Sequence, residues 1–169
     1  MPDVVVAPDT LPNIAVYIDR LDSMEVMFDY VAEYVAKHSA IAPPREFRLS
    51  DAEFAEFKRR VVESGFDYDP ESEKALGELE KLVKFEGYYD DAKEEFEALR
   101  KKLKHNVARD IEKEKATLKE MLERDIVTAF YYQAGGIENS MCYDKQLKEA
   151  VKLLDNEEEY KSKLQGGTK

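Results

Sequence analysis

The sequence predicts a mainly α-helical fold: a helical bundle of about six helices, with a long helix near residues 106–134 and a short N-terminal β-strand before it. Three observations support this prediction. Charged residues make up 37% of the 169 residues, and the chain has only 7 glycines and 6 prolines. Apolar residues, 43% of the total, recur at the three- and four-residue spacing of a helix with one buried face. Residues that cap helices precede most of these stretches.

The N-terminal segment is predicted to be a strand without a partner. Val4, Val5 and Val6 are consecutive β-branched residues between two prolines, a pattern typical of a short strand. A strand needs neighbouring strands to pair its backbone N–H and C=O groups, and every segment after Leu11 has helical spacing instead. We therefore expect this chain to be a piece of a larger protein whose sheet accepts the strand.

Two helices and a loop are expected next. The first helix, over residues 14–21, begins after Asn13, and the second begins after Asp22 or Ser23, because such side chains cap helix N-termini. Residues 39–45 contain two adjacent prolines and are expected to form a loop. The apolar face of the second helix is expected to consist of Met24, Met27, Phe28, Val31, Tyr34 and Val35.

The third helix has the clearest local signals. Ser50 and Glu53 have the spacing of a capping box, with Leu49 and Phe54 placed as a hydrophobic staple. Gly65 stands where a left-handed C-terminal cap is expected. The inner face is expected to contain Phe54, Phe57 and Val61.

An antiparallel helical hairpin is predicted to follow. Asp69 is expected to cap its first helix with Pro70 at the first helical position, and Gly87 is expected to end that helix. The second helix opens at Tyr88-Tyr89, so the connection is short enough for an antiparallel pair. The inner stripes are expected to contain Leu76, Leu79 and Val83 in the first helix, and Ala92, Phe96, Leu99 and Leu103 in the second.

The long helix begins near Asn106, and Gly135-Gly136 is expected to end or kink it. A last helix over residues 144–154 is expected to turn Leu147, Val151 and Leu154 inward. The predicted domain organisation is a strand remnant at 1–10, an N-terminal helical segment at 11–64, an antiparallel bundle at 65–164 and a disordered tail at 165–169.

Charge and chemistry exclude several classes of function. The net charge of −11 disfavours binding to nucleic acids or anionic membranes, and no apolar run is long enough to insert into a membrane. His38 and His105 have no metal-ligand spacing and are interpreted as surface residues near helix ends. Cys142 stands alone with no histidine near it in the sequence. We assign no catalytic residue, metal or cofactor to this chain.

The tyrosine pairs are the remaining candidates for a binding site. Tyr88 and Tyr89 begin a helix, and Tyr131 and Tyr132 lie late in the long helix. A tyrosine combines an apolar ring with a hydrogen-bonding hydroxyl, so these pairs are candidate contacts for a partner or an extended peptide. Half-buried packing between helices is the alternative interpretation.

Several segments, taken in order, resemble the S41 family of carboxyl-terminal processing peptidases, also called tail-specific proteases. Pro2-Asp3-Val4-Val5-Val6 is similar to the strand that follows the catalytic core in that family. The later segments resemble the helical C-terminal extension of one branch of the family: Phe28-Asp29-Tyr30-Val31, residues 47–54, Glu73-Lys74-Ala75-Leu76, residues 131–138 and residues 144–150.

The resemblance implies a parent serine peptidase with a Ser/Lys dyad and a PDZ domain, exported to the periplasm or cell envelope. This chain contains neither the catalytic core nor the PDZ domain, so the resemblance implies a non-catalytic helical domain. Its expected role is to buttress the core, shape substrate access, or mediate self-association or adaptor binding, with protein substrates handled by the parent. The alternative is an independent helical protein–protein interaction module with no link to a protease.

Overall fold

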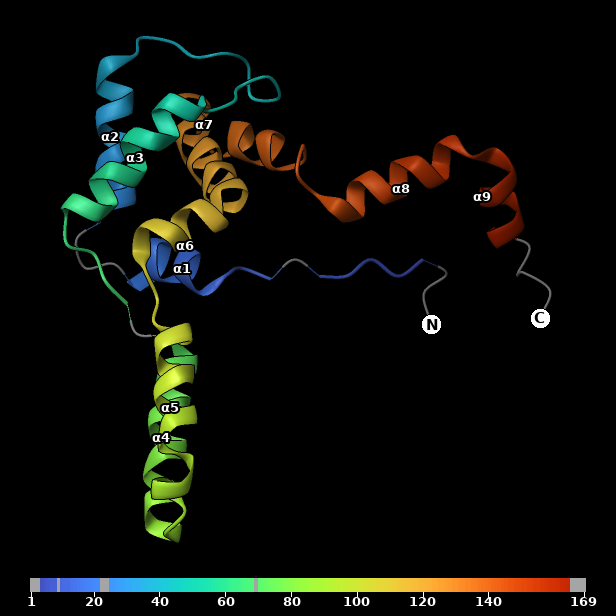
Figure 1. Ribbon diagram of the computed structural model, residues 1–169. Helices are drawn as coiled ribbons and strands as arrows, with labels where there is room; N and C mark the ends of the chain where they lie inside the picture. The colour runs from blue at the N-terminus through green and yellow to red at the C-terminus, as the bar shows by residue number, and fades with distance from the viewer. Residues whose placement is uncertain (1–3, 9, 22–24, 69, 165–169) are drawn as a thin grey trace. The chain divides into compact units, whose positions relative to one another are not determined.

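The computed structural model describes residues 4–8, 10–21, 25–68 and 70–164, and these residues are mainly helical (Figure 1). Within these ranges there is no β-strand, and the helical fold class is confirmed. The helices are α1 (Asn13–Val16), the π-helix η1 (Tyr17–Leu21), α2 (Val26–Lys37), α3 (Asp51–Glu63), α4 (Glu71–Glu86), α5 (Tyr89–Leu103), α6 (Val107–Lys113), α7 (Lys115–Ser140), α8 (Lys145–Asp155) and α9 (Glu157–Leu164).

The predicted N-terminal strand is wrong. Val4, Val5 and Val6 follow an irregular path and line a groove together with residues of α8. A ladder of backbone hydrogen bonds needs a second strand, and the described residues contain none. The Val5 side chain is 74% exposed, so the valines are only partly covered.

The chain forms two compact units, each with its own buried side chains. The first unit is built from the described parts of residues 1–10, 31–49 and 119–169, and the second from those of residues 11–30 and 50–118. The apolar core of the first unit consists of Tyr34, Phe47, Leu49, Met121, Leu122, Ile126 and Val127. The core of the second consists mainly of Ile14, Ala15, Ile18, Val26, Met27, Tyr30, Phe54, Phe57, Val61, Phe66, Ile111 and Leu118.

The local signals for helix ends are largely confirmed. Ser50 Oγ accepts a hydrogen bond from the Glu53 N–H, and the Glu53 carboxylate accepts one from the Ser50 N–H at 2.7 Å, which completes the capping box. Gly65 has φ +75° and Gly87 has φ +84°, so both adopt the left-handed conformation that ends a helix. The Asp144 side chain caps α8 by accepting from the Leu147 N–H at 2.9 Å.

Some predicted caps differ by a residue. α1 begins at Asn13 itself, after Pro12, and Asn13 makes no side-chain cap. α4 begins at Glu71 with Pro70 in the N-cap position, because a proline is favoured at the edge of a helix where no N–H is needed. The proposed caps Asp22, Ser23 and Asp69, with Met24 and the predicted tail at 165–169, lie outside the described residues.

The long helix predicted near 106–134 is interrupted. α6 ends at Lys113, and Glu114 has φ −101° and ψ 20° before α7 begins. Neither glycine nor proline marks this break. A second interruption at Tyr132, with φ 60° and ψ −170°, lies three residues before Gly135, so the kink expected from the two glycines is present.

Gly135 and Gly136 are required because the chain after this kink lies against the helix before it. A Cβ added at Gly135 would lie 2.3 Å from the Cβ of Tyr131, and one added at Gly136 would lie 2.1 Å from the Thr128 hydroxyl. Atoms cannot approach so closely without a shift of the backbone or of the neighbouring side chain. The glycines thus allow the corner within α7.

A buried carboxylate fastens the loop before α3 to α7. Glu123 is almost fully buried, and its carboxylate accepts a hydrogen bond from the Leu49 N–H at 2.9 Å and another from the Tyr143 hydroxyl. The Arg48 guanidinium lies 5.3 Å from the centre of the Tyr143 ring, a cation–π contact. The same loop accepts a hydrogen bond from the Asn139 amide at the Pro44 carbonyl, 2.8 Å away.

Several side chains predicted to face inward are exposed instead. The clearest are Phe28 on α2, which is 67% exposed, and Leu79, Leu99, Val151 and Leu154. Amphipathic spacing shows which side of a helix is apolar, but burial also requires a neighbour on that side. α4 and α5 pack on each other as the predicted antiparallel hairpin, and one neighbour covers only part of each apolar face.

The corner in α7 gives a prediction with a built-in control. We expect Gly135→Ala to lower the free energy of unfolding by about 1–3 kcal/mol, because the new methyl group overlaps Tyr131. The same substitution at Gly77, inside α4, meets no atom within 4 Å and is expected to raise stability by about 0.5–1 kcal/mol. Urea unfolding followed by circular dichroism measures both. Equal effects at the two positions would contradict the close approach at the corner.

The buried carboxylate gives a second prediction. Glu123→Leu leaves the buried Leu49 N–H without an acceptor, which is expected to cost about 1–3 kcal/mol beyond any change in packing. Glu123→Gln keeps a carbonyl acceptor of the same size, so its loss of unfolding free energy is expected to be smaller. Parallel denaturant titrations of the two variants provide the comparison. A glutamine variant as unstable as the leucine variant would show that hydrogen bonding at Leu49 is not the important factor.

Candidate docking surfaces

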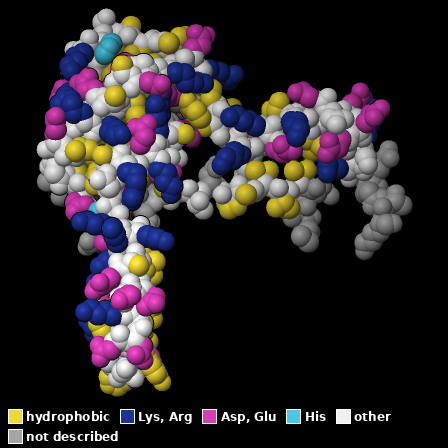
Figure 2. All heavy atoms as spheres, viewed as in Figure 1, with side chains coloured by type: hydrophobic (Ala, Val, Ile, Leu, Met, Phe, Trp, Pro, Cys, Tyr) yellow, Lys and Arg dark blue, Asp and Glu magenta, His cyan; other side chains and the backbone are white. Residues whose placement is uncertain are grey.

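The α4–α5 hairpin exposes an apolar edge. Figure 2 shows hydrophobic side chains along the hairpin and at the end where the chain turns from α4 to α5. Phe85 is the most exposed of them, at 90%. We define the hairpin edge as the exposed large apolar side chains of these two helices and their connection, which are Leu79, Leu82, Phe85, Tyr88 and Leu99.

Helix geometry explains why this edge is uncovered. Leu76 packs inward and is buried. Among the described residues of the hairpin, the only other buried large apolar side chain is Phe96. Leu82 and Phe85 are three residues apart and lie on a different side of α4 from Leu76. Glu78 and Glu86 stand four residues before and after Leu82, so acidic groups flank the apolar edge.

A polar bridge holds the hairpin together on another side of α4. The Glu80 carboxylate accepts a hydrogen bond from Lys84 Nζ at 2.7 Å and another from the Arg100 guanidinium of α5. These bonds, that of Lys84 first, lower the pKa of Glu80 to about 2. The pairing fixes the register of α4 against α5 and therefore the spacing of the apolar side chains along the hairpin edge.

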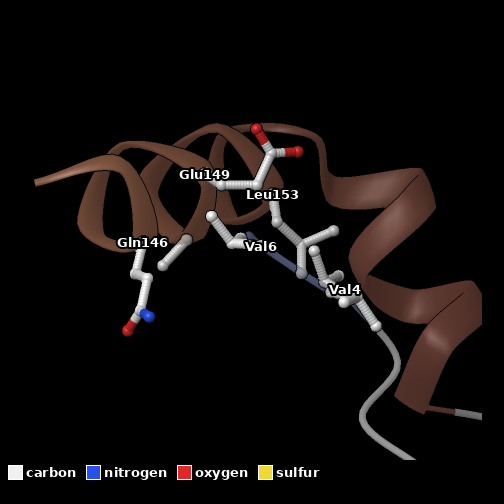
Figure 3. Close-up of a pocket in the computed structure, with 7 residues that line it drawn as sticks. Val4, Val6, Gln146, Glu149 and Leu153 are labelled. Carbon is white, nitrogen blue, oxygen red and sulfur yellow. The ribbon is translucent and has the colours of Figure 1, made fainter. Parts of the chain in front are cut away.

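A second apolar surface lies between the N-terminal segment and α8 (Figure 3). Val4, Val5 and Val6 line a groove with Ala150 and Leu153, and Gln146 and Glu149 supply its polar rim. No residue of α8 is buried, although the helix is strongly amphipathic. The extended valine segment therefore covers only part of the apolar face of α8.

The four predicted tyrosines have different environments. Tyr88 belongs to the exposed hairpin edge, whereas the Tyr89 ring packs against Phe96 with a centroid distance of 5.8 Å and lies 4.4 Å from Lys84 Nζ. The Tyr131 hydroxyl donates to the Ile41 carbonyl at 3.0 Å, and Tyr132 is 81% exposed at the kink of α7. The two pairs belong to different units, and their role as contacts stays a prediction.

The residues considered for chemistry are engaged in structural contacts. The Cys142 thiol lies 3.7 Å from the Arg45 carbonyl and 3.9 Å from the Glu138 carbonyl. His38 stacks on Tyr34 with a centroid distance of 4.1 Å. Within the described part of the chain, no cluster of three or more His, Cys, Asp or Glu side chains could hold a metal ion.

The sequence did not predict the contacts that His105 makes. Its imidazole contacts the carboxylates of Asp67 and Glu73, which are 38 and 32 residues earlier in the chain. Local spacing carries no signal for contacts at such separations, so the surface interpretation of His105 was incomplete.

Comparison with known families agrees with this architecture. A family model described as "Probable PDZ-protease, C-terminal helical domain" matches residues 17–154. No curated protein and no solved structure gives a significant match. In the described residues, no helix has both the length and the apolar character needed to cross a membrane. Because the matched region covers most of the chain, the protein belongs to the family of C-terminal helical domains of probable PDZ-proteases.

Proposed function

We propose that this chain is the non-catalytic helical domain of an S41 carboxyl-terminal processing serine peptidase and that its hairpin edge docks on another part of that protease. The catalytic Ser/Lys core belongs to the parent, which acts on protein substrates in the periplasm or cell envelope. Docking would buttress the core, shape access to it or mediate assembly. The observation that supports the proposal most is the uncovered apolar edge on a domain of the PDZ-protease family.

The distribution of exposed side chains favours a contact role over a passive one. A helical pair that only spaces other elements needs no apolar side chains on its outer surface, yet the hairpin edge carries five large ones. Removing an exposed phenylalanine from water contributes about 1.5–3 kcal/mol, so Phe85 alone is a strong potential anchor. Glu78 and Glu86 beside this edge favour a partner surface that is apolar with basic groups around it.

An independent interaction module is the second candidate. The same exposed edge supports it, because any protein partner with a complementary apolar surface would fit. Membership of the family of C-terminal helical domains of probable PDZ-proteases favours the first candidate. The two are separated by the identity of the partner: the catalytic part of the protease in the first case, and an unrelated protein in the second.

Phe85→Asp tests the docking role, and Phe28→Asp is its matched control. Both phenylalanines are exposed, at 90% and 67%, so neither substitution is expected to unfold the protein. We expect Phe85→Asp to weaken binding of this domain to the separately purified peptidase core by about 10- to 100-fold, because the anchor is lost and a charge is buried. Phe28→Asp is expected to leave the affinity unchanged. Titration calorimetry measures both.

Two outcomes would overturn the proposal. If Phe85→Asp bound the core as tightly as the unmodified chain, the hairpin edge would not be the docking surface. Cleavage of unstructured peptides by the isolated chain, sensitive to a serine-directed inhibitor, would show that the domain is itself an enzyme.

Amide hydrogen exchange in the complex of this domain with the peptidase core tests the predicted docking of the N-terminal segment. Docking of Val4, Val5 and Val6 on the core would slow exchange at those residues.

A further inference from the structure

One imidazole connects both ends of the α4–α5 hairpin. The chain enters the hairpin through the connection before α4 and leaves it at His105, between α5 and α6. His105 Nε2 lies 2.7 Å from the Asp67 carboxylate in the entering connection. Its Nδ1 lies 2.9 Å from the Glu73 carboxylate in the first turn of α4, and the His105 backbone N–H donates to the same oxygen at 2.9 Å.

The surroundings of His105 join the hairpin to the core of the second unit. The Tyr68 ring lies 4.8 Å from the imidazole, and its hydroxyl donates to the Asp110 carboxylate of α6 at 3.1 Å. Asn106, the next residue, caps α6 by accepting from the Arg109 N–H at 2.9 Å. Ile111 of α6 is fully buried, so α6 is a fixed base for these contacts.

The two ring contacts require a proton on each nitrogen. A neutral imidazole has one N–H donor and one acceptor, whereas the imidazolium has two donors. Both ring nitrogens face carboxylate oxygens, which only accept hydrogen bonds. The neutral ring can therefore donate to one carboxylate, while its other nitrogen directs a lone pair at the second carboxylate and is repelled by it. Burial alone would lower the pKa of His105, but the hydrogen bonds to Glu73 and Asp67 outweigh it and raise the pKa above 6.5.

We propose that His105 is a pH-sensitive clamp that joins the two ends of the hairpin through Asp67 and Glu73 when the ring is protonated and loosens both contacts when the ring is neutral. The Asp67 contact opens first, because that carboxylate is 74% exposed and is readily hydrated, and the Glu73 contact with the ring and with the His105 backbone N–H then opens more often. The charged groups around the ring are Asp67 and Glu73 in direct contact, with Arg109, Asp110, Lys113 and Glu114 on the adjacent groove. Release changes the freedom of the hairpin edge, so the clamp adds regulation to the proposed docking.

The sign of the pH effect follows from the raised pKa. The imidazolium is favoured in the folded state, so its stabilising contribution is complete below the unfolded value near 6.5 and is lost as pH rises through the folded value. The clamp is therefore closed in mildly acidic solution and opens on the alkaline side.

A histidine titration by NMR tests the protonation step directly. The chain has two histidines, so the His38→Gln variant has a single imidazole resonance, that of His105. We expect a midpoint above 6.5 in this variant. Asp67→Asn and Glu73→Gln, each added to it, are expected to move the midpoint down. A midpoint at or below 6.5, or one that neither substitution moves, would overturn the clamp.

Hydrogen exchange tests the release. The His105 N–H donates to Glu73, so its protection factor reports on this contact. In His38→Gln we expect this protection factor to fall as the pH rises past the midpoint of the His105 titration. The expected decrease is about tenfold for each pH unit by which the pKa of His105 in the folded protein exceeds 6.5. Amides of the buried residues Leu122 and Ile126 are the internal control and are expected to keep their protection. His105→Gln, which cannot titrate, is expected to show low protection at every pH. Constant His105 protection in His38→Gln would contradict release, whether or not His105→Gln folds.

Discussion

The burial of apolar side chains is the constraint on which this structure depends. Each unit has a core of buried apolar residues from the segments before α4 and after α5, whereas Leu76 and Phe96 are the only apolar side chains that the hairpin buries and α8 buries no residue. An amphipathic helix gains most of its stability from a neighbour that covers its apolar face. The hairpin and α8 therefore have apolar faces that the described residues cover only in part. Burying these faces against a partner would be stabilising, and this is the physical basis for a docking role.

Two local devices position these surfaces. The corner of α7 depends on Gly135 and Gly136, because a larger side chain would collide with Tyr131 or Thr128. The hairpin depends on Gly87 for its turn and on Glu80 for its register, and His105 joins its two ends. The first device is steric and insensitive to pH, and the second includes a titratable group. With the clamp proposed for His105, the core of each unit would stay fixed while the freedom of the hairpin varied with pH.

The sequence predicts the local features well and the tertiary ones poorly. The capping box at Ser50, the left-handed glycines and the antiparallel hairpin all follow from residues that are close in the chain, and all are confirmed. The breaks at Glu114 and Tyr132 involve no proline, so no local signal marks their exact positions. Val4, Val5 and Val6 have strand-forming side chains, but a strand needs a second strand to pair with, and the described residues contain none. The His105 cluster joins residues more than thirty positions apart, and a single sequence gives no indication of such contacts.

Site-specific photo-cross-linking can detect whether the hairpin edge contacts another part of the protease. A photoreactive phenylalanine analogue would replace Phe85 in cells that express the entire protease, with the same replacement at Phe28 as the control. We expect cross-links from position 85 to the catalytic or PDZ part and none from position 28. Equal labelling from both positions, or cross-links from position 85 only to unrelated proteins, would contradict docking through the hairpin edge.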